Sequence, residues 1–154
     1  MENYIIQLIM APIGSIGFAL LFRLRLRYLP TAAVGGFFCW GIYLLAAHFT
    51  EGVFLPTMIS SAYCALFSEI AARIHKAPAT LFLITSLVPL IPGSTLYYTM
   101  LHAAQRNWPM AAYFGVRTGQ FALGIAAGSC IVWVCHDILR SFSRSNPVQT
   151  HSEE

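Results

Sequence analysis

Two prolines, a glycine and two hydroxyl residues interrupt the apolar stretch "LVPLIPGSTLYY". They are Pro89, Pro92, Gly93, Ser94 and Thr95. A proline has no N–H to donate to the carbonyl four residues earlier, so consecutive turns of a helix lose hydrogen bonds here. Glycine permits the chain to turn, and the side-chain oxygens of Ser94 and Thr95 suit the cap of a new half-helix. Because the ends of half-helices present free carbonyls and free N–H groups, we expect a substrate or ion site that also includes Tyr97. The alternative is a plain proline kink that neighbouring side chains satisfy.

A second feature is an arginine inside an apolar segment. Arg117 lies roughly 10 Å below the expected membrane surface, where a charge is costly unless it is paired or hydrated. At 100° per residue, Arg117 and Gln120 share one stripe of a helix with Tyr113, Gly124 and Gly128. The guanidinium can reach the middle of the membrane and hold a carboxylate in bidentate fashion, or it can extend outward to the interface.

Glu69 and Arg73 form a third group, near the end of another apolar segment, with Lys76 on the same helix face. One interpretation is a simple ion pair at the membrane interface. The other is gating or proton coupling through Glu69, since a carboxylate in a partly dry site can hold a proton. The histidines near segment ends are expected to be interfacial residues: His48, His75, His102 and His136.

Other chemistries have no support in the sequence. No set of His, Cys and carboxylate residues has metal-ligand spacing, so we expect no metal site and no cofactor. No serine has an evident base partner, which argues against an enzyme. The four cysteines lie inside apolar runs and are expected to be small core residues. The basic residues lie between apolar runs, so nucleic-acid binding is not expected.

The elements that must position these residues are membrane helices. Hydrophobic residues make up 57% of the 154, charged residues 10%, and the mean hydropathy is +0.65. We therefore expect an all-α, polytopic integral membrane protein. Five spans are predicted within a transmembrane domain of residues 1–139, namely residues 4–22, 31–49, 53–72, 79–101 and 110–139. The break in the fourth falls about 15 Å in, near mid-membrane. Residues 140–154 are expected to be a mobile cytoplasmic tail.

The distribution of basic residues predicts the orientation. Five crossings put the first and third connections on the same side as the tail. That side holds seven basic residues: Arg23, Arg25, Arg27, Arg73, Lys76, Arg140 and Arg144. The other side holds Arg106 alone. The positive-inside rule therefore places the N-terminus outside and the C-terminus in the cytoplasm.

Two small-residue patterns in the fifth segment match G-x-x-x-G, namely "GVRTG" (115–119) and "GIAAG" (124–128). This spacing lets helix backbones approach closely. We expect the fifth helix to be packed inside a bundle.

The run from Ser68 to Met100 resembles the C-terminal membrane unit of the threonine/serine exporter family, including its stand-alone YjjB-like form. The shared positions are Glu69, Ala72, Arg73, Pro78, Phe82, Pro89, Pro92, Gly93 and Tyr97. The resemblance is strongest over residues 60–101. It extends over most of the chain by hydropathy and span number.

The resemblance implies a proton-driven exporter of threonine and serine in the cytoplasmic (inner) membrane. Family members have a second, homologous membrane unit, fused ahead of this one or supplied as a separate chain, and this chain is expected to be the other half. Its odd number of spans fits two units of opposite orientation. Ser94 and Arg117 are then expected to hold the substrate carboxylate, and carbonyls freed by Pro89 and Pro92 to face the ammonium.

Two alternatives stay open. Some split members of the family look like exporters of C4 dicarboxylates such as succinate, although a second carboxylate needs a second cation. A non-transporting assembly or regulatory subunit would use the prolines only to shape a packing interface.

Overall fold

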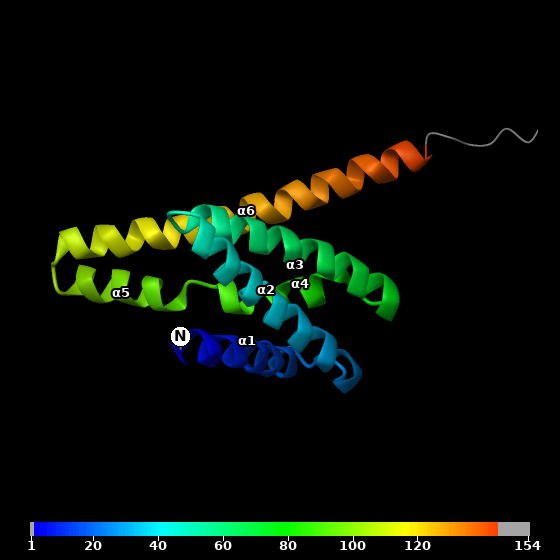
Figure 1. The fold of residues 1–154 in the computed structure, drawn as a ribbon, viewed down its shortest axis with the longest axis horizontal. Coiled ribbons are helices and arrows are strands. Elements are labelled where there is room, and N and C mark those ends of the chain that lie inside the picture. Colours follow the sequence, from blue (N-terminus) through cyan, green and yellow to red (C-terminus); the bar gives the residue numbers. More distant parts are fainter. Residues whose placement is uncertain (1, 145–154) are drawn as a thin grey trace, which may run out of the picture.

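The computed structural model describes residues 2–144, and these residues are helical apart from short connections (Figure 1). The elements in chain order are α1 Glu2–Leu21, the 3₁₀ turn η1 Leu26–Tyr28, α2 Leu29–Phe49, α3 Phe54–His75, α4 Ala79–Leu87, the 3₁₀ turn η2 Val88–Leu90, α5 Gly93–Ala104 and α6 Trp108–Arg144.

Four of these helices, α1, α2, α3 and α6, are long and apolar enough to cross a membrane. The segments 79–90 and 93–104 pass the same test as a pair and are bent by 56° at the break between them. The pair makes a fifth span when it is counted as one. The chain is therefore an all-α polytopic membrane protein whose fourth predicted segment is broken, as the sequence predicts.

Contacts between helices show how the spans alternate. α2 and α3 run antiparallel, because Thr31 bonds to His75 while Cys39 bonds to Ser60. α3 and α6 run in the same direction, because Ser61 bonds to Gly124 while Arg73 bonds to His136. Figure 1 shows the two helices next to one another near the start of α3. The third and fifth spans of an alternating bundle must point the same way, so this arrangement fits five crossings.

The first and third connections lie close together. Arg23 and Arg25 from the first and Lys76 from the third line a shared depression of about 340 Å³. Arg23 and Lys76 both have positive φ angles, 54° and 51°, which turn the chain sharply after α1 and α3. Three basic residues thus lie at one end of the bundle.

The "GIAAG" pattern forms the close contact between α3 and α6. A Cβ at Gly124 would lie 2.9 Å from the Phe54 carbonyl oxygen, and one at Gly128 would collide with the Met58 carbonyl. Ser61 also donates a hydrogen bond of 3.1 Å to the Gly124 carbonyl. The expected packing of this helix is therefore confirmed for the second pattern.

The "GVRTG" pattern does not make a comparable contact. A Cβ at Gly115 would be at an ordinary 3.5 Å from Thr99 Cγ2, and one at Gly119 would meet nothing within 4 Å. Because both patterns have the same spacing, the sequence predicts close backbone packing at each of them. Only the one facing α3 brings two backbones together.

The C-terminal helix is longer than expected. α6 continues to Arg144, whereas the expected tail begins at Arg140. Residues 140–144 contain neither glycine nor proline, and the first proline after them is Pro147, so nothing ends the helix earlier. The rest of the expected tail, residues 145–154, lies outside the described residues.

The glycine contacts give a stability prediction. Gly128→Ala should lower the midpoint of thermal unfolding in detergent, because the new methyl meets the Met58 backbone, which cannot rotate away; overpacking of this kind costs about 1–3 kcal/mol. Gly17→Ala is the matched control, since a Cβ there meets nothing within 4 Å. Equal midpoints for the two variants would contradict a close α3–α6 contact.

Candidate functional site

Two backbone hydrogen bonds shape the break in the fourth span. Leu87 ends α4, η2 follows as one turn, and Ile91 then adopts an extended conformation with φ −63° and ψ 121°. The Ile91 N–H bonds to the Val88 carbonyl at 3.2 Å, and the Gly93 N–H bonds to the Ile91 carbonyl at 2.8 Å. These two bonds close the turn that the prolines force on the chain.

The start of α5 differs from the expectation in one respect. Pro92, and neither Ser94 nor Thr95, occupies the cap position, and no side chain caps the helix. The hydroxyl of Thr95 instead donates back to the Pro92 carbonyl at 3.1 Å. The reason is that the helix begins one residue before the expected cap, so both hydroxyl residues fall inside its first turn.

This start leaves backbone donors at the break. The Leu96 N–H bonds to the Pro92 carbonyl at 3.0 Å, which is the first bond of the regular helix. The N–H groups of Ser94 and Thr95 precede it and have no partner within an α-helix. A helix N-terminus of this kind favours a negatively charged group.

Thr118 connects the broken span to the helix that carries Arg117. Its hydroxyl lies 3.0 Å from Thr95 Oγ1 and 2.9 Å from the Phe114 carbonyl, so its single proton is shared between two acceptors. This contact fixes the first turn of α5 against α6. Thr118 is a residue that the sequence analysis missed, because a threonine inside an apolar run has no signature of its own.

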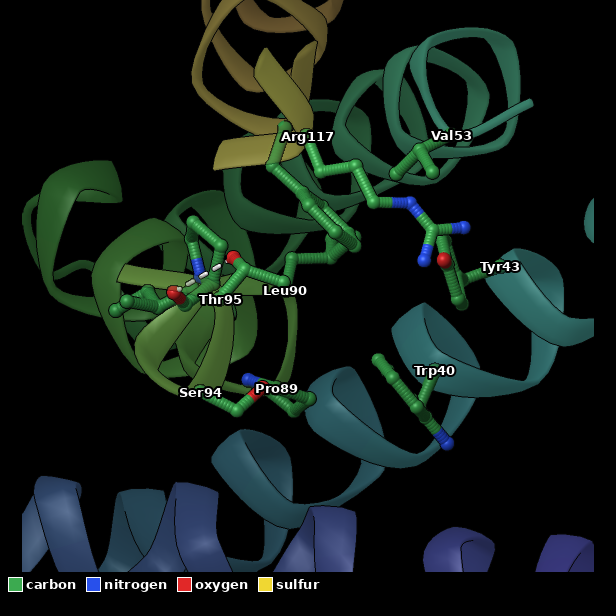
Figure 2. A pocket seen from close by; sticks show the side chains of 11 residues that line it. Trp40, Tyr43, Val53, Pro89, Leu90, Ser94, Thr95 and Arg117 are labelled. Carbon is green, nitrogen blue, oxygen red and sulfur yellow. Dashed lines mark hydrogen bonds between the residues drawn. The ribbon is translucent and has the colours of Figure 1, made fainter. Parts of the chain in front are cut away.

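A cavity of about 280 Å³ opens at the break (Figure 2). This is just below the range of about 300–1,000 Å³ that ligand pockets occupy, so its size suits only a small molecule. Its wall comes from α2, the start of α3, the break, α5 and α6. The lining residues are Trp40, Tyr43, Val53, Pro89, Leu90, Ile91, Pro92, Ser94, Thr95, Arg117 and Phe121.

Arg117 supplies the positive charge of this cavity. Figure 2 shows its guanidinium extending toward Tyr43, across the cavity from Pro89 and Ser94. The Tyr113 ring, one turn earlier in α6, lies 5.5 Å from the Arg117 Cζ atom and contributes a cation–π contact. Among the described side chains of residues 4–138, the only acidic and basic groups within ion-pair distance of one another are Glu69 and His136. Arg117 therefore has no carboxylate partner among these residues.

The structure gathers five of the expected site residues and separates the others. Pro89, Pro92, Ser94, Thr95 and Arg117 line the cavity. Three expected residues do not line it: Gly93, Tyr97 and Gln120. The Tyr97 side chain is 61% exposed and packs edge-on against Tyr98.

Six lining residues were not expected, and they are Trp40, Tyr43, Val53, Leu90, Ile91 and Phe121. Trp40 and Tyr43 stack on one another at 4.9 Å between ring centroids, and Tyr43 also packs against Phe121. Aromatic residues three apart in a membrane helix are ordinary, so their spacing gave no signal. Phe121 lies four residues after Arg117, and that position on the same helix face was the available clue.

Glu69 and Arg73 lie in α3, at a second location. The expected ion pair between them does not form directly, because His136 of α6 stands between the two. His136 Nε2 is 2.8 Å from Arg73 Nη2 and 3.9 Å from Glu69 Oε2. His136 was expected to be a plain interfacial residue, and its contacts with α3 are a finding of the structure.

Residues 7–135 match the family described as threonine/serine exporter, ThrE, and this range includes every residue that lines the cavity. The chain belongs to the threonine/serine exporter family. No solved structure matches the chain. In this exporter-family protein, the matched range runs from the first membrane helix to the fifth predicted span.

The cavity gives a prediction about water access. In a Cys130→Ser, Cys135→Ser background, Ser94→Cys should react with a charged, water-soluble maleimide, because Ser94 is exposed and lines the cavity. Ser86→Cys is the control, since Ser86 is fully buried between helices and should stay unlabelled. Mass spectrometry of the labelled protein checks both. An unreactive Ser94→Cys would mean that water does not reach the break.

Proposed function

We propose that this chain is a membrane subunit of a secondary transporter that exports threonine or serine, driven by the proton gradient. Membership of the exporter family supports the class of activity. The observation that carries the proposal for this chain is the cavity at the break, where the start of α5 and the Arg117 guanidinium face the same space. Both are groups that bind a carboxylate.

The contents of the cavity favour an amino acid over a dicarboxylate. Arg117 is the one cationic side chain among the residues that line it. It can hold one carboxylate, and a second carboxylate would need a second cation in the same cavity. An ammonium group needs an oxygen acceptor. Pro89 leaves the Thr85 carbonyl near the end of α4 without its helical donor, whereas the Val88 carbonyl already accepts from the Ile91 N–H.

The cavity is also open on one side, which supports a second subunit. Ser94 and Arg117 are exposed, and no residue of α5 is buried. An open polar site inside a membrane is tolerated only when protein or water covers it. A homologous unit of opposite orientation, supplied by a separate chain, would close the site from the side that this chain leaves open.

The positions of the charges support an orientation in the membrane. We propose that the protein is a multi-pass subunit of the cytoplasmic (inner) membrane, with its N-terminus outside and its C-terminus in the cytoplasm. The shared depression that contains Arg23, Arg25 and Lys76 supports this orientation, because basic residues of short connections stay on the cytoplasmic side.

The first test is efflux of radiolabelled threonine from membrane vesicles that contain this chain alone, or this chain with a homologous second unit. We expect efflux only when both chains are present, because the one-sided cavity is then covered. Efflux from this chain alone would mean that copies of it complete the site. Efflux of succinate in place of threonine would overturn the amino-acid substrate.

The second test concerns the arginine. In vesicles with both units, Arg117→Gln should raise the threonine concentration for half-maximal efflux by roughly 10- to 100-fold, which corresponds to the loss of about 1.5–3 kcal/mol for a hydrogen bond to a charged group. Arg106→Gln is the matched control, because it removes the same charge from the connection between α5 and α6.

If Arg117→Gln leaves efflux unchanged while Pro92→Ala abolishes it, Arg117 does not bind the substrate, and the break in the fourth span is still part of the site. Unchanged efflux in both variants would favour an assembly or regulatory subunit, for which the prolines only shape a packing surface.

A further inference from the structure

We propose that His136, held between Arg73 and Glu69, is a proton-binding site of this chain in which the imidazole exchanges partners on protonation. The inference rests on the proposed function, because it names the group that binds the coupling proton. The site lies at the α3–α6 contact, away from the cavity at the break, and shares no residue with it.

The distances define the neutral form of the imidazole. His136 Nε2 lies 2.8 Å from Arg73 Nη2, a normal hydrogen-bond distance. A guanidinium only donates hydrogen bonds, so Nε2 must be the acceptor and carry no proton. The observed contact therefore requires neutral His136 with its proton on Nδ1.

Protonation reverses the role of the same nitrogen. With a proton on Nε2, His136 has no lone pair there and can no longer accept from Arg73, and two cations would face each other. Glu69 Oε2 is already 3.9 Å from Nε2, so a small side-chain shift creates a charge-assisted hydrogen bond. One bound proton thus breaks the His136–Arg73 contact and forms a His136–Glu69 contact.

The surroundings of His136 allow this exchange. Its side chain is 31% exposed and that of Glu69 is 27% exposed, so protons can reach the site while bulk water only partly screens it. Arg73 is exposed, and its long side chain can leave without disturbing the core.

Among the described side chains, the charged groups near this imidazole belong to α3 and α6. α6 packs against α3 over this half and against α5 over its other half, which lies at the opposite end. α3 contributes Glu69 and Arg73. Lys76 follows as the C-cap of this helix, in the left-handed backbone conformation. On α6 itself Asp137 is exposed, and Arg140 stands one turn further on. His75 of α3 is engaged elsewhere, 2.9 Å from Thr31 Oγ1 of α2.

The first test is direct and needs no transport. In the full chain with ¹⁵N-labelled histidine, in lipid nanodiscs, we expect neutral His136 to show an unprotonated Nε2 and a protonated Nδ1. The signal is assigned by its loss in His136→Gln. On acidification Nε2 should gain a proton, and a contact to the Glu69 carboxyl should appear. A neutral form with its proton on Nε2 would overturn the proposal.

The second test uses proteoliposomes with both transporter units. His136→Gln and Glu69→Gln should retain threonine exchange in the absence of a pH gradient and lose the acceleration that an imposed gradient gives. The control His48→Gln, at the far end of α2, should retain both. A His136→Gln transporter that is still accelerated by the gradient would overturn the proposal. Loss of both the exchange and its acceleration would also overturn it, because that result indicates a structural role for His136.

The two proposals fail in different ways. Absence of threonine exchange in the unmodified transporter would count against the proposed substrate, and the histidine spectra would still decide the proton site. Threonine exchange together with the wrong His136 tautomer would count against the proton site alone.

Discussion

The need to satisfy backbone polar groups in lipid is the constraint on which the other features of this structure depend. Pro89 and Pro92 remove two donors from the fourth span, and the chain responds with a 3₁₀ turn, an extended residue and a new helix at Gly93. Backbone that is not helical is tolerated at membrane depth only beside protein or a wet cavity. α2 and α6 supply that protein, and the cavity lies between them and the break.

The long helix α6 contributes side chains to both polar sites, the cavity at the break and the His136 site. Its first half carries Thr118, whose hydroxyl bonds to Thr95 at the start of α5, and Arg117, which lines the cavity. Its second half carries His136, which contacts α3. Between them, Gly124 and Gly128 bring its backbone against α3. Larger side chains at those two positions would separate the helices. The position of Arg117 at the break therefore depends on packing several turns away.

Features that depend on local chain chemistry were predictable from the sequence. Apolar runs gave the spans, and the spacing of Pro89, Pro92 and Gly93 gave the break, because each proline removes a specific hydrogen bond. Features that depend on which helix faces become neighbours were not predictable. Trp40, Tyr43 and Phe121 join the cavity, and His136 meets Arg73, only because helices far apart in sequence pack together. The cap at Pro92 was missed for a smaller reason, because α5 begins two residues earlier than a cap at Ser94 would place it.

The separation of the two polar groups limits how a proton and a substrate can influence one another. Arg117 and His136 lie on the same helix, roughly 28 Å apart at about 1.5 Å per residue. At that distance the two groups have no contact partner in common. A bound proton and a bound carboxylate therefore cannot compete for one group. Any coupling between them has to pass through a structural element with two arrangements, and the parallel α3–α6 contact reaches from the cavity side to His136.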